Sequence, residues 1–121
     1  MKRIIKLKEN RDFRRAYNKG ESFVSPYFVV YILKKKTEKV RLGITVSKKI
    51  GGAVMRNRAK RIITAAFREC LPNIALGYDF VIVARTRIVT VKSTVILENL
   101  KSYIVKAGIW NENELDKQNT D

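Results

Sequence analysis

Apolar and polar residues alternate with a period of two over much of residues 22–47, which predicts two β-strands. The first covers Ser22 to Leu33, and Pro26 within it indicates a break or an edge position. The second covers Val40 to Ser47 and alternates cleanly between aliphatic residues and polar or small ones. The polar segment Lys34 to Lys39 joins them, so we expect a half-buried antiparallel pair of strands.

The two alternating sets predict which face of this strand pair is buried. One set is expected to join the core: Val24, Phe28, Val30, Ile32, Val40, Leu42, Ile44 and Val46. The opposite set includes polar and aromatic side chains that do not suit a core: Tyr27, Tyr31, Arg41, Thr45 and Ser47. We therefore expect one face of the sheet to remain open and to carry these groups.

A helix is predicted ahead of the strands, over Arg11 to Lys19. Asn10 is the expected N-terminal cap, and Gly20 is the expected end of the helix. Phe13 and Tyr17 are four residues apart, so both aromatic rings lie on one face of this helix.

Two more helices and a third strand are predicted in the second half of the chain. A helix is expected from about Ala53 to Leu71, where Pro72 ends it. Tyr78 to Arg85 is almost entirely apolar, which is typical of a central strand that is buried on both faces. A last helix is expected from Thr90 to about Ala107, followed by Gly108.

Charge adds a strong indication of function to this pattern. The 121 residues include 26 Lys and Arg and 11 Asp and Glu, which gives a net charge of +15. The last eleven residues hold four acids and one lysine, so we expect a single domain over 1–110 and a disordered acidic tail over 111–121. A domain this basic repels itself unless a polyanion is close. Nucleic acid is the expected partner, and an anionic membrane surface is the second choice.

Composition excludes several other classes of protein. No segment approaches the roughly 20 apolar residues of a membrane span, and the N-terminal apolar stretch is too short for a secretion signal. Cys70 is the single cysteine, which rules out an internal disulfide and a cysteine-based zinc cluster. We expect a cytoplasmic protein that requires neither a membrane nor an obligate protein partner.

The helix expected over 53–71 separates into an apolar and a basic face at about 100° per residue. The apolar face is expected to pack on the sheet and contains Met55, Ala59, Ile62, Ile63, Ala66 and Cys70. The opposite face contains Asn57, Lys60, Arg61, Thr64 and Arg68, with Arg56 and Arg58 at its flanks. Cys70 is thus interpreted as a small core residue and not as a reactive thiol.

The basic face is unusual because nothing in the sequence nearby balances it. Six basic residues and no acidic one occur between Lys48 and Arg61, whereas a solvated helix face usually mixes both signs. This favours phosphates as the missing counter-charge. Gly51 and Gly52 let the backbone approach such a ligand closely, just before a helix N-terminus where anions are favoured.

The residues do not suit catalysis of RNA cleavage by the protein itself. Histidine, the usual general acid and base near neutral pH, is absent. A two-metal nuclease needs several converging carboxylates, but the acids of 1–110 are spread over different predicted elements: Glu9, Asp12, Glu21, Glu38, Glu69, Asp79 and Glu98. Asp12 is interpreted as a helix-start residue and Asp79 as the start of a strand. We expect no catalytic residue and no metal site in the protein.

A family resemblance is carried by residues 47–61, whose sequence is SKKIGGAVMRNRAKR. This segment resembles the signature of the bacterial ribonuclease P protein component, in which Arg-Asn-Arg is followed by a basic pair. Weaker similarity extends over about residues 7–107, including the segment at Asn10 to Phe13 and the strands at 28–31 and 78–85. Gly52 departs from the pattern, where Asn is expected in many members.

The resemblance implies a small α+β protein, a two-layer α/β sandwich of order α-β-β-α-β-α. Its sheet would be mixed and mostly antiparallel, with a left-handed βαβ crossover that contains the basic helix. It also implies that catalysis belongs to a large RNA subunit, with Mg²⁺ held mainly by RNA and substrate phosphates. The protein would bind that RNA and the single-stranded 5′ leader of precursor tRNA, and so assist endonucleolytic removal of the leader.

Two RNA-binding regions follow from the resemblance together with the predicted faces. The leader cleft would involve Phe13, Tyr17, Tyr31, Thr45 and Ser47. The basic loop and helix would involve Lys48, Lys49, Arg56, Asn57, Arg58, Lys60, Arg61 and Arg68. The main alternative is a structural RNA-binding protein, such as a ribosomal protein, which would not need an aromatic cleft for a single strand. A DNA-binding regulator is a third possibility, but no clear recognition helix is predicted.

Overall fold

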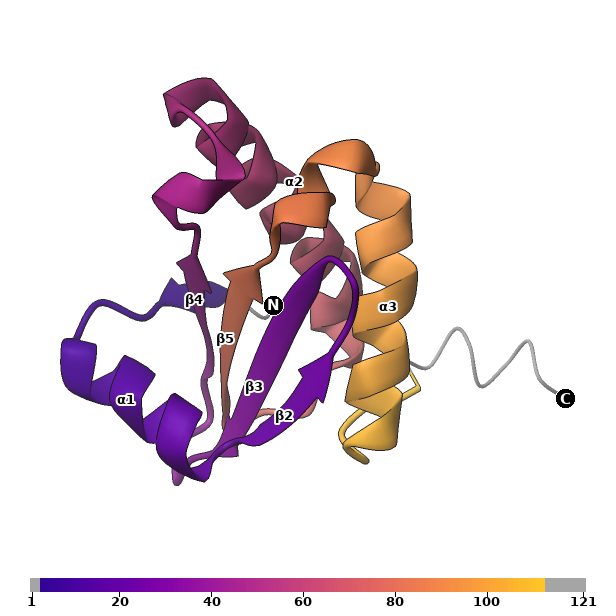
Figure 1. The fold of residues 1–121 in the computed structure, drawn as a ribbon. Helices are drawn as coiled ribbons and strands as arrows, with labels where there is room; N and C mark the ends of the chain where they lie inside the picture. Colours follow the sequence, from indigo (N-terminus) through magenta and orange to yellow (C-terminus); the bar gives the residue numbers. More distant parts are fainter. Residues whose placement is uncertain (1–2, 113–121) are drawn as a thin grey trace, which may run out of the picture.

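The computed structural model describes residues 3–112 and folds them into a five-stranded sheet with three helices (Figure 1). The strands are β1 (Ile4–Lys6), β2 (Glu21–Val24), β3 (Phe28–Lys34), β4 (Val40–Thr45) and β5 (Tyr78–Ala84). The helices are α1 (Asn10–Lys19), α2 (Ala53–Cys70) and α3 (Ser93–Lys106). The α+β class is confirmed. The predicted order α-β-β-α-β-α did not include β1. It also treated β2 and β3 as one strand.

The sheet has the order β1-β4-β5-β3-β2, with β5 in the centre. β5 pairs antiparallel with β3 and parallel with β4, while β1 is parallel to β4 and β2 is antiparallel to β3. The mixed sheet and the central position of β5 are therefore confirmed, but two of the four strand pairs are parallel, so the sheet is not mostly antiparallel as expected. The expected pairing of β3 with β4 is wrong, because β5 lies between them. α2 connects β4 to its parallel neighbour β5, and the left-handed sense of this crossover stays a prediction.

Pro26 marks a complete reversal of the chain and not a bend within one strand. β2 folds back on β3, so that Phe23 pairs with Val30 and shares its face. The alternation therefore changes phase at the turn. Val24, expected in the core, is 61% exposed, and Tyr27, expected on the open face, packs partly buried against the core.

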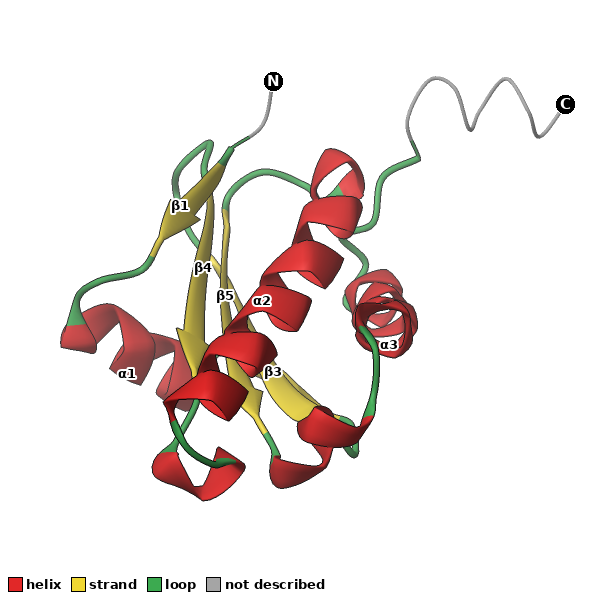
Figure 2. Cartoon of the chain, turned by 90° about the horizontal axis from the view of Figure 1, so that it is seen from above, coloured by secondary structure: helices red, strands yellow, loops and turns green. Residues whose placement is uncertain are grey.

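The main core lies between one face of the sheet and the helices α2 and α3 (Figure 2). The sheet contributes buried apolar side chains from three strands: Phe28, Val30, Ile32, Val40, Leu42, Phe80 and Ile82. The helices contribute Ala59, Ile63, Ala66, Phe67, Cys70, Ile96, Leu100 and Ile104. Burial confirms Cys70 as a core residue. Phe67, which the wheel analysis omitted, is fully buried and meets the Phe80 ring edge to face at 5.1 Å.

The opposite face of the sheet is covered only in part, by α1 (Figures 1 and 2). A small second core forms there from Leu7, Ala16 and Val81, with Phe13, Tyr31 and Val83 packed around it. The expected open face therefore exists, but α1 adds a partial third layer to the sandwich. The remainder of this face is not covered by a helix of the described residues.

Helix boundaries agree closely with the sequence predictions except at the starts of α1 and α3. Asn10 is the first residue of α1 and not its cap, since Glu9 occupies the capping position. Gly20 does end the helix, and its N–H donates to the carbonyl of Ala16 at 2.9 Å. α3 begins at Ser93 and not at Thr90, because residues 86–90 form a separate 3-10 turn. The predicted tail 111–121 lies, from residue 113 onward, outside the described residues.

Candidate nucleic-acid interface

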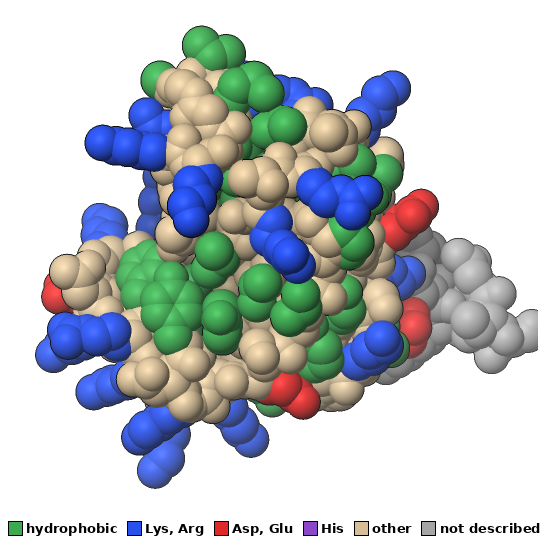
Figure 3. All heavy atoms as spheres, viewed as in Figure 1, with side chains coloured by type: hydrophobic (Ala, Val, Ile, Leu, Met, Phe, Trp, Pro, Cys, Tyr) green, Lys and Arg blue, Asp and Glu red, His purple; other side chains and the backbone are tan. Residues whose placement is uncertain are grey.

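A shallow groove runs between α1 and the uncovered part of the sheet. We call it the open-face groove; it has a volume of about 640 Å³ and is lined by Asn10, Phe13, Arg14, Tyr17 and Thr45. Phe13 and Tyr17 lie one turn apart on α1, as their spacing predicts. On this side of the molecule, apolar side chains gather beside α1 and over the sheet, with Lys and Arg side chains around them (Figure 3).

Contacts with the sheet fix the aromatic rings of the groove. The Tyr17 ring meets the Tyr31 ring edge to face, with 5.0 Å between centroids, and the Tyr17 hydroxyl lies 3.3 Å from Thr45 Oγ1. Tyr17 is nevertheless 39% exposed, so part of its ring faces solvent. Phe13 lies over Gly43 of β4, where an added Cβ would come within 2.6 Å of the ring. Gly43 thus leaves the space that seats Phe13, which both packs on the sheet and lines the groove.

An ion-pair cluster joins α1 to the sheet beside this groove. The Arg41 guanidinium on β4 donates to both carboxylate oxygens of Asp79 on β5, at 2.8 and 2.6 Å, and lies 3.5 Å from a carboxylate oxygen of Asp12 on α1. These hydrogen bonds and the two negative charges raise the pKa of Arg41 above its ordinary value. The cluster couples three elements and holds α1 in place.

The sequence pattern does not reveal this cluster. Asp12 and Asp79 were assigned to a helix start and a strand start, yet both are buried. Arg41 and Asp79 are direct partners in the β4–β5 register. Only the pairing of β4 with β5 would have revealed them as neighbours, and the sequence pattern predicted a different pairing.

A basic loop precedes α2 at one end of the sheet. Ser47 is exposed, and its side-chain oxygen accepts a hydrogen bond from the Lys49 N–H at 3.3 Å, at the start of the 3-10 turn Lys48–Ile50. Gly51 then adopts φ of 143°, which favours glycine, and α2 begins at Ala53. Lys48 and Lys49 are exposed. Ser47 therefore lies with this loop and is not among the residues that line the open-face groove.

Most of the basic face of α2 is exposed, and Arg56 and Arg58 at its flanks are half-buried. Asn57, Lys60, Arg61 and Arg68 are exposed. Arg58 is half-buried, and its guanidinium donates to the carbonyls of Val89 and Val91 at 3.3 and 3.2 Å.

Arg58 therefore holds the segment before α3. Arg56 is also half-buried, and its Nε is the only fully buried side-chain nitrogen or oxygen atom among residues 3–112 that lacks a hydrogen-bond partner. Met55, expected in the apolar stripe of α2, is 37% exposed at the start of the helix.

Potential metal-ligating side chains are scattered in the described part of the chain. Within 3–112, no group of three or more His, Cys, Asp or Glu side chains is placed to hold a metal ion. In the same part of the chain, no helix is both long and apolar enough to cross a bilayer. The fold and its surface charge define a small basic α+β domain with an aromatic groove.

Comparisons with known proteins identify the family. The model of the family Ribonuclease P matches residues 1–108. The ribonuclease P protein component of Clostridium beijerinckii is 40% identical over 119 residues, which cover 93% of this chain and 95% of that protein. The solved RNase P protein of Staphylococcus aureus superposes with a TM-score of 0.77 at 37% identity, covering 88% of this chain and 97% of its own. The RNase P protein of Thermotoga maritima gives 0.73 at 32% identity, covering 82% and 94%.

The chain belongs to the ribonuclease P protein family. It is thus a protein component of the endoribonuclease ribonuclease P, a tRNA-processing enzyme. The resemblance found in the sequence is confirmed.

Proposed function

We propose that this chain binds the catalytic RNA subunit of ribonuclease P through the basic loop and α2, and holds the single-stranded 5′ leader of precursor tRNA in the open-face groove. Leader binding is supported by the half-exposed aromatic surface of Phe13, Tyr17 and Tyr31, which lies beside an uncovered face of the sheet.

Such a groove suits a single strand of mixed sequence. Aromatic rings stack on unpaired bases with little sequence preference, and each stack is worth about 1–3 kcal/mol by alanine substitution. Arg14 lines the same groove and supplies positive charge for the phosphates. A subunit that serves many tRNA precursors needs this tolerance.

The exposed side chains of α2 suit the phosphates of a folded RNA. Lys60, Arg61 and Arg68 are exposed, and no described acidic side chain forms a salt bridge with any of them. Arginine can grip two phosphate oxygens at once, and each neutralised phosphate releases counterions. Asn57 is neutral, so we assign it a hydrogen bond to RNA or to a neighbouring side chain.

We assign the cleavage chemistry to the RNA subunit, with Mg²⁺ held mainly by RNA and substrate phosphates. The two buried acids in the described part of the chain, Asp12 and Asp79, are both engaged by Arg41 and are not free to bind a metal. The protein's own role is then to bind and orient the RNA. We also propose that the protein acts in the cytoplasm.

The leader assignment is tested by removing one ring at a time. Replacing Tyr31 or Phe13 by Leu keeps apolar bulk but removes the stacking surface. The affinity of the holoenzyme for precursor tRNA should fall about five-fold or more, from the lower end of the stacking range.

Affinity for mature tRNA and assembly with the RNA subunit should remain as in the wild type. Equal losses for precursor and mature tRNA would show that the groove does not contact the leader. Unchanged binding with a lower melting temperature would show that these rings serve only to pack α1 on the sheet.

A further inference from the structure

The outer edge of β4 is paired along only half of its length, by the short edge strand β1. β1 pairs with β4 only at Val40, Arg41 and Leu42, and the N–H of Leu7 donates the last hydrogen bond, to the Leu42 carbonyl at 3.0 Å. β4 continues to Thr45, so its last three residues lack a strand on this side. An unpaired strand edge presents backbone donors and acceptors to a ligand.

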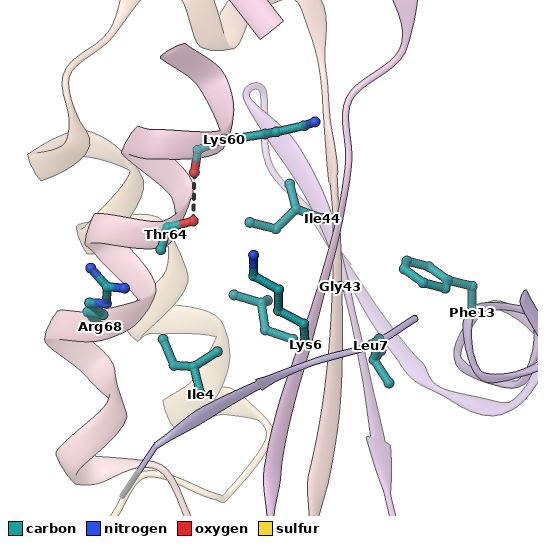
Figure 4. A pocket seen from close by; sticks show the side chains of 10 residues that line it. Ile4, Lys6, Leu7, Phe13, Gly43, Ile44, Lys60, Thr64 and Arg68 are labelled. Atoms are coloured by element: carbon teal, nitrogen blue, oxygen red, sulfur yellow. Dashed lines mark hydrogen bonds between the residues drawn. The ribbon is translucent and has the colours of Figure 1, made fainter. Parts of the chain in front are cut away.

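A pocket of about 380 Å³, which we call the edge pocket, lies at this point between β1, β4 and α2 (Figure 4). Its floor is apolar and includes Ile4, Leu42 and Ile44. Three cationic side chains surround this floor: Lys6 from β1, and Lys60 and Arg68 from α2. Lys6 and Lys60 extend into the space between α2 and β4 (Figure 4). The combination suits a ligand that has both an apolar ring and a negative charge.

Within residues 3–112, the three cations have no anionic partner. The salt bridges among residues 3–112 all belong to Arg41, and none of them involves Lys6, Lys60 or Arg68. Like charges that converge on one pocket repel each other, so an anion in the pocket would relieve that repulsion. The volume lies near the lower end of the roughly 300–1,000 Å³ of small-ligand sites, which leaves room for about one nucleotide.

The edge pocket also connects the two RNA-binding regions. Phe13 lines both the edge pocket and the open-face groove. On the other side, Lys60, Thr64 and Arg68 line both the edge pocket and a shallow depression on α2 that includes Arg61. The edge pocket therefore neighbours both other hollows and lies between them beside the unpaired edge of β4.

We propose that the edge pocket holds one further nucleotide of the single-stranded leader, so that the strand leaves the open-face groove past Phe13 and turns around the edge of β4 towards α2. This proposal rests on the leader binding proposed above. The base would lie on the apolar floor, and Lys6 would neutralise its phosphate. Lys6 is the residue that distinguishes this site, because it belongs to neither of the regions assigned above.

The test uses the reconstituted holoenzyme and precursor tRNAs whose leaders grow by one nucleotide at a time. Lys6→Gln should bind short leaders as the wild type does and should lose affinity only once the leader is long enough to reach the edge pocket. For those long leaders the slope of log K against log salt concentration should be about 0.7 shallower for Lys6→Gln than for the wild type. The ratio of wild-type to variant affinity should therefore shrink roughly threefold between 50 and 200 mM salt. Lys36→Gln is the matched control, because Lys36 is exposed and lines none of the three hollows.

Two outcomes overturn the proposal. Equal affinities of Lys6→Gln and wild type at every leader length would show that no leader nucleotide reaches Lys6. A loss that is the same for all leaders and for mature tRNA, or weaker assembly with the RNA subunit, would show that the RNA subunit occupies the pocket.

A second measurement does not depend on affinity. Lys6→Cys, labelled with a photo-crosslinker in a Cys70→Ala background, should crosslink to leader nucleotides beyond those held in the groove; crosslinks to the RNA subunit alone would contradict the proposal. The variant Tyr31→Leu in the same leader series separates the two hypotheses. If Tyr31→Leu loses leader affinity and Lys6→Gln does not, only the edge pocket assignment fails. If Tyr31→Leu shows no dependence on the leader, the proposed function itself fails.

Discussion

Replacing Arg41 by Met should destabilise the protein severely, although the side chain keeps much of its length. Arg41 makes two short hydrogen bonds to Asp79 and a longer contact to Asp12. Asp79 is 2% exposed and Asp12 is 8% exposed, so both carboxylates would remain buried without a cation. A buried charge that loses its partner is costly because water cannot solvate it.

The size of the effect follows from the burial of the cluster. Breaking a buried ion pair typically costs about 3–5 kcal/mol. Because the Arg41 side chain is 23% exposed, we expect the lower end of that range, about 3 kcal/mol. For a domain of this size, such a loss lowers Tm by roughly 10–15 °C.

Urea and thermal unfolding of the isolated protein, followed by circular dichroism, would measure this loss. Arg15→Met on the exposed side of α1 is the matched control and should cost less than about 0.5 kcal/mol. The double variant Arg41→Met with Asp79→Leu should recover part of the lost stability, since it removes the more deeply buried of the two stranded carboxylates and leaves Asp12. If Arg41→Met and Arg15→Met unfold alike, the cluster contributes nothing and α1 is held by its apolar contacts alone.

Three other properties can be checked directly. Protein freed of nucleic acid should not cleave precursor tRNA in Mg²⁺, since its sequence contains no histidine; specific 5′ cleavage without the RNA subunit would contradict this. Arg61→Ala should reduce the slope of log K against log salt concentration for RNA-subunit binding by about 0.7–0.9 and leave Tm unchanged. Arg58→Ala should reduce that slope and also lower Tm, because two backbone carbonyls lose their hydrogen bonds. Equal Tm values for the two variants would refute this distinction. Burial raises the pKa of the Cys70 thiol from 9.0 to about 11, so the folded protein should resist thiol reagents at pH 8. The free energy of unfolding should decrease as the pH rises from 9 to 11, because the thiol of the unfolded chain loses its proton first. Rapid labelling, or a free energy of unfolding that does not change over this pH range, would contradict the burial of Cys70.

Local patterns predicted most of the elements and the character of both surfaces. The apolar run at 78–85 indicated the central strand, because only burial on both faces tolerates such a composition. The spacing of Phe13 and Tyr17 placed both rings in one groove, since helix geometry alone determines that face. Helix geometry also placed the basic residues of α2 on one side, and that side is exposed.

Features that depend on contacts distant in sequence were not predictable in this way. The pairing of β3 with β5, and not with β4, is decided by how α2 and α3 pack on the sheet, which no short pattern records. β1 has three residues, too few for a periodicity to be visible. Arg41 and Asp79 became partners only through the β4–β5 register, so their cluster was hidden by the same error.

The central position of β5 has a consequence for how the chain folds as it is synthesised. β5 is the last strand to leave the ribosome, yet it supplies the partners of both β3 and β4. Until residue 84 has emerged, those two strands have no common neighbour, and the pairing of Phe28 with Ala84 must close a long loop. Contacts of such long range slow folding, and exposed strand edges invite aggregation in the meantime. Chains truncated before Tyr78 should therefore remain unfolded, and folding of the complete domain should follow its release as one late and cooperative event.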